Sequence, residues 1–176
     1  MANVLTSVRL LLTAPLVWAV LARRWPLGLA LFLLGVATDV LDGWVARRER
    51  PTLLGQLLDP LADKLFYAGA FGALYGAGRV PLLGLILYAV PPLGIGLGTL
   101  ILWRRRRELR ARWPGKAAAG LTALAGGLLL LTEKAVFVFW VAVAAQFSAA
   151  LYYLLLQARR RTPEAEGPQI PARRRP

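Results

Sequence analysis

Six long apolar segments, separated by short loops that carry most of the charge, constrain the fold of this chain more than any other feature. An α-helix needs about 20 mostly apolar residues to cross a bilayer. Segments of about this length cover residues 4–22, 27–46, 56–78, 80–103, 115–132 and 135–158. We therefore predict an all-α, polytopic integral membrane protein with six transmembrane helices.

The composition agrees with a membrane protein and argues against other classes. Apolar residues make up 57% of the 176 residues and charged residues only 18%, against about 25% in soluble domains. The net charge of +13 would suit a nucleic-acid-binding protein, but so apolar a chain is unlike a soluble one, and we expect no nucleic-acid partner. Cys and His are both absent, so acid–base or metal chemistry falls to the nine carboxylates and to Lys, Tyr, Ser and Thr.

The distribution of basic residues orients the six segments. Most of the 22 Lys and Arg residues lie near the N-terminus, in the second and fourth loops and in the C-terminal tail, which share one side of the membrane. Arg23, Arg24, Arg79 and Lys134 lie on the other side. Because cytoplasmic loops are enriched in Lys and Arg, we expect cytoplasmic termini in the cell inner (cytoplasmic) membrane. We also expect one domain over residues 1–158 and a disordered, basic, Pro-rich cytoplasmic tail over residues 159–176.

Four aspartates lie near the adjoining ends of the second and third segments, where a charged side chain is costly. Asp39 and Asp42 are spaced i, i+3, and Asp59 and Asp63 are spaced i, i+4, so each pair shares one helix face. Two adjacent antiparallel helices would bring both pairs to one spot on the cytoplasmic side. Because clustered carboxylates repel one another without cations, and hard divalent ions prefer oxygen ligands, the cluster predicts metal-assisted phosphoryl chemistry at the inner membrane surface.

The residues around these aspartates complete a known pattern. It reads Asp39-x-x-Asp42-Gly43-x-x-Ala46-Arg47, followed by Gly55-x-x-x-Asp59-x-x-x-Asp63. This pattern resembles the signature of the CDP-alcohol phosphatidyltransferase family, and six membrane spans are also typical of that family.

The resemblance implies a reaction in which an alcohol attacks the β-phosphorus of a CDP-linked lipid, usually CDP-diacylglycerol, and CMP leaves. It implies two divalent metal ions, Mg²⁺ or Mn²⁺, with Asp39, Asp42, Asp59 and Asp63 as their ligands. Asp63 is also the expected general base for the acceptor hydroxyl. The CMP pocket is expected to be lined by Gly43, Ala46, Arg47 and Gly55. Members of the family are usually homodimers, so a homodimer is expected here.

The acceptor alcohol is less well defined by the sequence. The string Asn3-x-x-Thr6-x-x-Arg9 and the sequence of residues 59–64 are similar to the phosphatidylglycerophosphate synthase-like branch, which favours glycerol 3-phosphate. Arg9 and Lys116 are the candidate acceptor-binding residues. Phosphatidylglycerol, as in cardiolipin synthesis, and inositol phosphate are alternative acceptors. A divalent-cation transporter is the alternative from a different class, because it could also hold four buried carboxylates.

Overall fold

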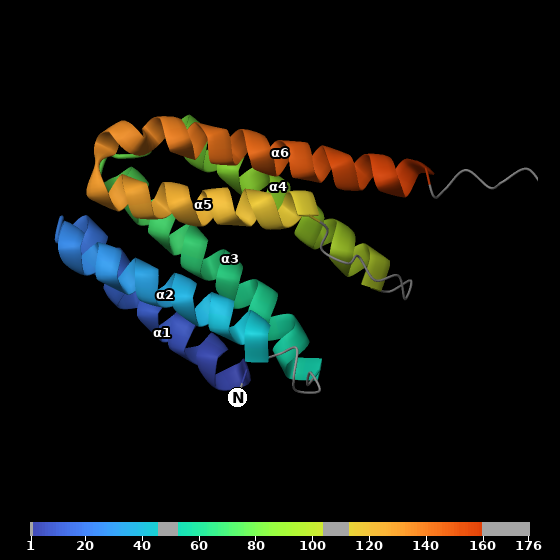
Figure 1. Ribbon diagram of the computed structural model, residues 1–176, viewed down its shortest axis with the longest axis horizontal. Helices are drawn as coiled ribbons and strands as arrows, with labels where there is room; N and C mark the ends of the chain where they lie inside the picture. Colours follow the sequence, from blue (N-terminus) through green and yellow to red (C-terminus); the bar gives the residue numbers. More distant parts are fainter. Residues whose placement is uncertain (1, 46–52, 104–112, 160–176) are drawn as a thin grey trace, which may run out of the picture.

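The computed structural model describes the backbone of residues 2–45, 53–103 and 113–159, and the side chains of residues 7–41, 62–94 and 113–156. Within these ranges the chain is helical and contains no strand (Figure 1). The elements are α1 Ala2–Leu21, α2 Trp25–Val45, α3 Leu53–Gly76, α4 Leu82–Trp103, α5 Trp113–Leu131, the 3-10 helix η1 Glu133–Ala135, and α6 Val136–Arg159. The all-helical prediction is confirmed. The predicted tail, apart from its first residue in α6, lies outside the described residues.

Two parts of the described chain are long and apolar enough to cross a membrane. They are α5 and the segment Glu133–Leu156, which consists of η1 and α6 as far as Leu156. Shorter apolar stretches occur at Ser7–Leu21 in α1, Trp25–Leu41 in α2 and Leu82–Gly94 in α4. The structure thus supports the membrane character of the chain at two of the six predicted spans.

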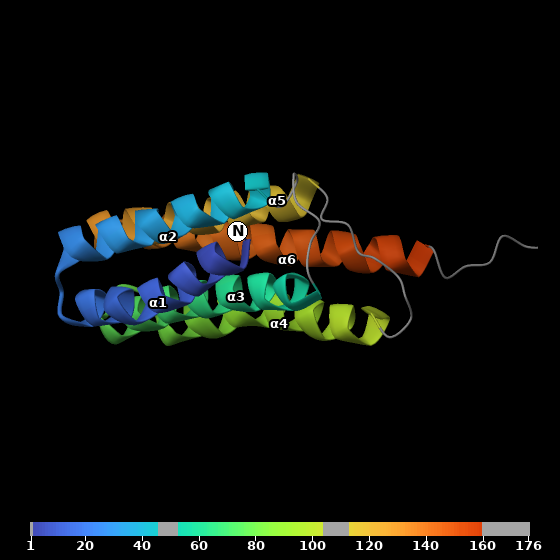
Figure 2. The ribbon, with the colours of Figure 1, turned by 90° about the horizontal axis from the view of Figure 1, so that it is seen from below.

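The α-helices form an elongated bundle whose contacts close a ring in the order α1, α2, α5, α6, α4 and α3 (Figures 1 and 2). The first helix packs closely along both α2 and α3, whereas the backbones of α2 and α3 approach each other at only a few positions. The two helices that carry the aspartates therefore both pack along α1 and contact each other mainly through large side chains, and not by the close backbone packing that the sequence suggested.

Aromatic side chains fill the centre of the bundle. Phe32 of α2 stacks on Phe66 of α3 with ring centroids 5.7 Å apart. Further along α3, Phe71 contacts Tyr88 of α4 at 4.6 Å and Phe139 of α6 at 5.2 Å between centroids. All five rings are buried. Because aromatic pairs contribute about 0.5–1.5 kcal/mol beyond their buried area, this layer joins four of the helices.

Many large apolar side chains lie instead on the outside of the bundle. Leu11 of α1, Leu33 of α2 and Phe137 of α6 are 74%, 53% and 73% exposed. Extensive exposed apolar surface marks contact with a membrane or a partner. This exterior is consistent with a bundle surrounded by lipid.

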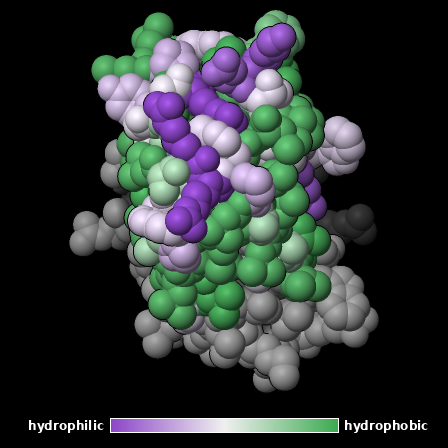
Figure 3. All heavy atoms as spheres, turned by 90° about the vertical axis from the view of Figure 1, so that its left-hand side faces the viewer, coloured by the Kyte–Doolittle hydropathy of each residue, from purple (hydrophilic) through white to green (hydrophobic). Residues whose placement is uncertain are grey.

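One end of the bundle carries the turns α1–α2, α3–α4 and α5–α6. Hydrophilic side chains gather across this end, with hydrophobic side chains around them (Figure 3). Arg79 in the α3–α4 turn lies over the ring of Trp25, with Cζ 3.4 Å from the ring centroid, and donates a hydrogen bond to the carbonyl oxygen of Leu129. Gly78 adopts a φ of +83°, a conformation that favours glycine, in the turn that carries Arg79. These contacts tie α2, α5 and the α3–α4 turn together.

Gly35 of α2 allows the ring of Phe66 to approach the helix backbone, and we expect Gly35→Ala to destabilise the bundle. A β-carbon at residue 35 would lie 2.2 Å from Cζ of Phe66, whose buried ring is stacked on Phe32. We expect a loss of about 1–3 kcal/mol, measured as a lower thermal unfolding midpoint in detergent. Gly72→Ala is the control, because a β-carbon added at residue 72 would have no neighbouring side chain within 4 Å. Equal midpoints for the two variants would contradict the prediction.

Candidate active site

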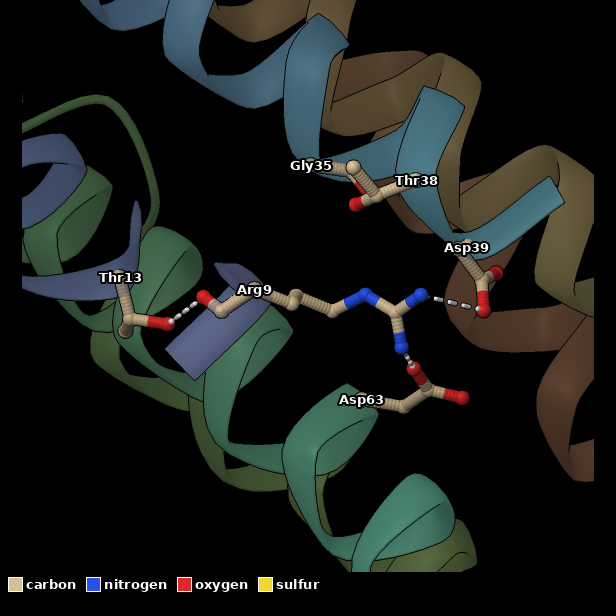
Figure 4. A network of polar contacts seen from close by, with 6 residues as sticks. All are labelled: Arg9, Thr13, Gly35, Thr38, Asp39 and Asp63. Atoms are coloured by element: carbon tan, nitrogen blue, oxygen red, sulfur yellow. Dashed lines mark hydrogen bonds and ion pairs between the residues drawn. The ribbon is translucent and has the colours of Figure 1, made fainter. Parts of the chain in front are cut away.

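Three charged side chains from three helices meet at one point in the bundle (Figure 4). Arg9 of α1 directs its guanidinium between Asp39 of α2 and Asp63 of α3. The Nη2 atom of Arg9 lies 3.2 Å from Oδ1 of Asp39, and the Nη1 atom donates a hydrogen bond to Oδ1 of Asp63. One guanidinium thus bridges two carboxylates from different helices. We call this arrangement the Arg9 bridge.

The three members of the Arg9 bridge differ in burial. Arg9 is 2% exposed, whereas the side chains of Asp39 and Asp63 are 42% and 40% exposed. A buried charge is tolerated only when it is paired, so the two carboxylates account for the position of Arg9 inside the bundle. The carboxylates themselves keep a large accessible surface with which to contact a ligand.

Helical spacing explains why both aspartates face inward. In α2, Phe32 and Gly35 precede Asp39 by seven and four residues, so the three residues share the inward face. In α3, Asp63 lies next to buried Ala62 and one turn before Tyr67. It therefore lies at the edge of the inward face of this helix. The carboxylates therefore lie on the same faces as the core residues of their helices.

Asp39 and Asp63 line a cavity of about 460 Å³ that is bounded by α2 to α6. This volume is within the range of about 300–1,000 Å³ that is typical of small-molecule sites. Lys64 and Tyr67 lie beside the aspartates, and much of the remaining wall consists of small or apolar residues. Polar groups also occur further along the wall, at Tyr88, Thr122, Gln146 and Tyr153. The cavity therefore offers a charged region together with a mostly uncharged wall.

The structure brings together two of the four predicted metal ligands, Asp39 and Asp63. Asp42 and Asp59 lie one helical turn from them, on α2 and α3, and their side chains are outside the described residues. Among the side chains that are described, no group of three or more potential metal-ligating residues occurs. Metal binding by all four aspartates therefore stays a prediction.

The predicted substrate-binding residues are only partly described. Gly43 and Gly55 lie in α2 and α3, where no side-chain surroundings are described, and Ala46 and Arg47 lie outside the described residues altogether. Lys116 is exposed in the first turn of α5, next to a cavity-lining glycine. Arg9, the other candidate for the acceptor, contacts the two aspartates (Figure 4).

The sequence did not reveal the Arg9 bridge or the neutral polar groups of the cavity wall. Arg9 and Gln146 are both polar residues within apolar spans, where an isolated polar group is costly. This cost could have indicated from the sequence that each of the two side chains has a partner or a ligand. The identity of the partners could not be read from it, because they lie on other helices.

Comparison with known proteins assigns the chain to a family. The model of the CDP-alcohol phosphatidyltransferases matches residues 1–148. The chain belongs to the CDP-alcohol phosphatidyltransferase family. Members of this family are membrane-bound transferases that use a CDP-linked alcohol and an acceptor alcohol. The family assignment thus favours a phosphatidyltransferase over the cation transporter.

Relatives of this CDP-alcohol phosphatidyltransferase include bacterial and animal enzymes. A CDP-diacylglycerol–glycerol-3-phosphate 3-phosphatidyltransferase of Pseudomonas fluorescens is 32% identical over 163 residues, which cover 82% of this chain and 78% of the relative. A probable phosphatidylglycerophosphate synthase of Mycobacterium tuberculosis (strain ATCC 25618 / H37Rv) is 30% identical over 138 residues, or 74% and 66% of the two chains. Human cardiolipin synthase (CMP-forming) is 33% identical over 81 residues, which are 45% of this chain but only 27% of the relative.

Proposed function

We propose that this enzyme transfers a phosphatidyl group from CDP-diacylglycerol to glycerol 3-phosphate and releases CMP. Family membership supports the class of donor. The similarity to the Pseudomonas fluorescens enzyme, which extends over 82% of this chain, carries the choice of acceptor. Phosphatidylglycerol is the second candidate acceptor, because 45% of the chain is similar to human cardiolipin synthase.

Asp63 is the proposed general base. Its carboxylate is 40% exposed and lines the cavity, so an acceptor hydroxyl can come within hydrogen-bonding distance of it. As Asp63 takes the proton, the acceptor oxygen bonds to the β-phosphorus of the donor. The bond from that phosphorus to the oxygen of CMP breaks, and CMP leaves.

The remaining site residues would bind the two substrates. Gly43, Ala46, Arg47 and Gly55 would line the CMP pocket, where small residues leave room and a guanidinium can pair with phosphate oxygens. Lys116 and Arg9 would bind the phosphate of the acceptor through charge-assisted hydrogen bonds.

The described carboxylates also suit the divalent metal ions on which the family generally depends. Oxygens of Asp39 and Asp63 converge from two helices on one positively charged group, the guanidinium of Arg9. Carboxylate oxygens are the ligands that Mg²⁺ and Mn²⁺ prefer. Asp39, Asp42, Asp59 and Asp63 would together hold two such ions. When bound, these ions would supply the positive charge that offsets the pyrophosphate.

We further propose that all six α-helices span the inner membrane, with both termini and the Arg9 bridge on the cytoplasmic side. The loop charges and the exposed apolar side chains of several helices support this topology. Residues 1–158 would form the catalytic domain and residues 159–176 a cytoplasmic tail. Two copies of the chain would associate as a homodimer.

Measurement of CMP release tests the proposed function. In the presence of Mg²⁺ or Mn²⁺, the purified full chain should release CMP from CDP-diacylglycerol when glycerol 3-phosphate is added. Removal of the metal by EDTA should abolish this release, because the pyrophosphate would lose its positive counter-charge.

An acceptor panel completes this experiment. Phosphatidylglycerol, inositol phosphate and serine replace glycerol 3-phosphate in parallel reactions. Release with phosphatidylglycerol alone would reassign the acceptor. No release with any acceptor, in either metal, would refute the transferase.

A further inference from the structure

Three neutral polar side chains from three helices lie together in the wall of the cavity, and two of them share a hydrogen bond. The Nε2 atom of Gln146 on α6 donates a hydrogen bond to Oγ1 of Thr122 on α5, at 2.9 Å. Thr122 in turn donates to the carbonyl oxygen of Ala118, at 2.8 Å. Tyr88 on α4 lines the same part of the cavity as Gln146. We call Tyr88, Thr122 and Gln146 the Gln146 cluster.

The Gln146 cluster lies in mostly apolar surroundings. Thr122 and Tyr88 are only 4% and 9% exposed, and alanines and prolines make up much of the neighbouring cavity wall. A polar group in such surroundings is costly unless its hydrogen-bonding capacity is used. A carboxamide has two N–H donors and one oxygen acceptor. The hydrogen bond from Nε2 to Thr122 uses one of these donors, and the remaining N–H and the carboxamide oxygen allow Gln146 to bind a further group in the cavity.

The chemistry of the cluster selects the kind of group that it can bind. Among the described residues, the charged side chains that line the cavity are Asp39, Asp63 and Lys64. All three lie on α2 and α3, whereas the Gln146 cluster lies on α4, α5 and α6. A phosphate binds best to a cation. A neutral amide and two hydroxyls instead match an alcohol hydroxyl, which both donates and accepts hydrogen bonds.

We propose that the Gln146 cluster binds the non-reacting 2-hydroxyl of a glycerol acceptor while the reacting hydroxyl faces Asp63. This inference rests on the proposed function and deepens it, because it defines the acceptor as a vicinal diol rather than a simple alcohol. Both candidate acceptors, glycerol 3-phosphate and phosphatidylglycerol, carry such a diol. Gln146 is thereby a specificity-determining residue, and the amide selects substrates by a hydrogen bond that an acceptor without the 2-hydroxyl cannot make.

A pair of acceptors that differ only in the 2-hydroxyl tests the proposal. Glycerol 3-phosphate and 3-hydroxypropyl phosphate are compared by CMP release in the presence of Mg²⁺. Wild-type enzyme should prefer glycerol 3-phosphate by about tenfold or more in kcat/KM, because a buried site built for a hydroxyl rejects an analogue that lacks it. If phosphatidylglycerol is the only acceptor used, the pair becomes phosphatidylglycerol and phosphatidyl-1,3-propanediol.

Variants then locate the source of this preference. Gln146→Leu should raise KM for glycerol 3-phosphate by about tenfold with a smaller change in kcat, and should leave the reaction of 3-hydroxypropyl phosphate nearly unchanged. The preference should therefore fall to about one. Ser148→Ala is the matched control, because Ser148 is exposed on the same helix and donates to the carbonyl oxygen of Ala144. Tyr88→Phe, which keeps the ring in the core, should reduce the preference even if Gln146→Leu does not fold.

The possible results separate the subsite from the function. If wild-type enzyme uses both acceptors equally well, or if its preference survives in a folded Gln146→Leu or in Tyr88→Phe, the subsite is wrong and the transferase stands. If wild-type enzyme releases CMP with neither member of either pair, the proposed function fails, and this inference fails with it.

Discussion

Asp63→Asn should reduce CMP release by about a thousandfold or more, because a general base contributes about 10²–10⁴ to the rate and an amide cannot accept the proton. Asn has nearly the same shape as Asp and can still accept a hydrogen bond from Arg9. The substitution should therefore leave the bundle folded while it removes the base. Initial rates of CMP release at saturating donor and acceptor, together with a thermal unfolding curve, measure both parts of the prediction.

Glu133→Gln is the matched control for Asp63→Asn. It also replaces an acid by its amide, but Glu133 is exposed in η1, next to the end of α5 that carries the Arg79 contacts. We expect wild-type rates for this variant. An Asp63→Asn enzyme that retains a tenth or more of the wild-type rate would remove Asp63 from the role of general base.

Arg9→Met should lower the stability of the metal-free protein and lower the metal concentration that is needed to stabilise it. The substitution keeps an unbranched side chain but leaves Asp39 and Asp63 without their shared cation. Removal of one partner of a fully buried pair costs about 3–5 kcal/mol. Because both carboxylates here are about 40% exposed, we expect a smaller loss of about 1–3 kcal/mol, seen as a lower unfolding midpoint in EDTA.

The same variant should bind Mn²⁺ more tightly than wild-type enzyme does. In wild-type enzyme the guanidinium already lies between the carboxylates, so a metal ion at the proposed site would compete with it for their oxygens. We expect the Mn²⁺ concentration that gives half of the thermal stabilisation to fall about tenfold in Arg9→Met, equivalent to about 1.4 kcal/mol.

Two further variants separate the effects of charge and of geometry at Arg9 from the general loss of a cation. Arg9→Lys keeps the charge but lacks the forked geometry that bridges two carboxylates, and should lie between wild type and Arg9→Met. Arg24→Met removes a cation that lies over Trp18, with 5.0 Å between Cζ and the ring centroid, and should not alter the response to Mn²⁺. An unchanged EDTA midpoint and an unchanged Mn²⁺ response in Arg9→Met would show that Arg9 is not a counter-ion for the carboxylates of the proposed metal site.

The positions of the helices could be predicted closely from the sequence. No end of an α-helix differs from its predicted segment by more than three residues, because long apolar runs alternate with turns marked by Arg, Gly or Pro. The order in which the helices pack could not be predicted. Hydrophobic periodicity identifies an inward face but not the neighbour on that face. The extensive packing of α1 on both α2 and α3 is therefore known only from the structure.

For the candidate site too, the positions of the charged residues along the helices could be predicted, but most of their contacts with other helices could not. The spacing of Asp39 with Asp42, and of Asp59 with Asp63, predicted that carboxylates of the two helices face one region, and the structure describes this for Asp39 and Asp63. The same reasoning assigned Arg9 to a substrate and missed its contact with both carboxylates, because the distance that its side chain spans depends on how closely α1 approaches α2 and α3. Tyr88 and Gln146 were not assigned to one cavity, since they lie on helices that are not consecutive in the chain.

The contacts of Arg79 have a consequence for how a lipid substrate could enter and leave. Trp25 and Leu129 are attached to Arg79 at one end of the bundle, so small tilts of the helices would pivot about that end. A helix of about 20 residues is about 30 Å long, and a tilt of about 5° would move its far tip by about 2–3 Å. Widening would thus be greatest away from the pivot, at the tips, and least beside Arg79. Any helix tilt that admits a substrate would therefore be smallest at the end of the bundle that Arg79 holds together.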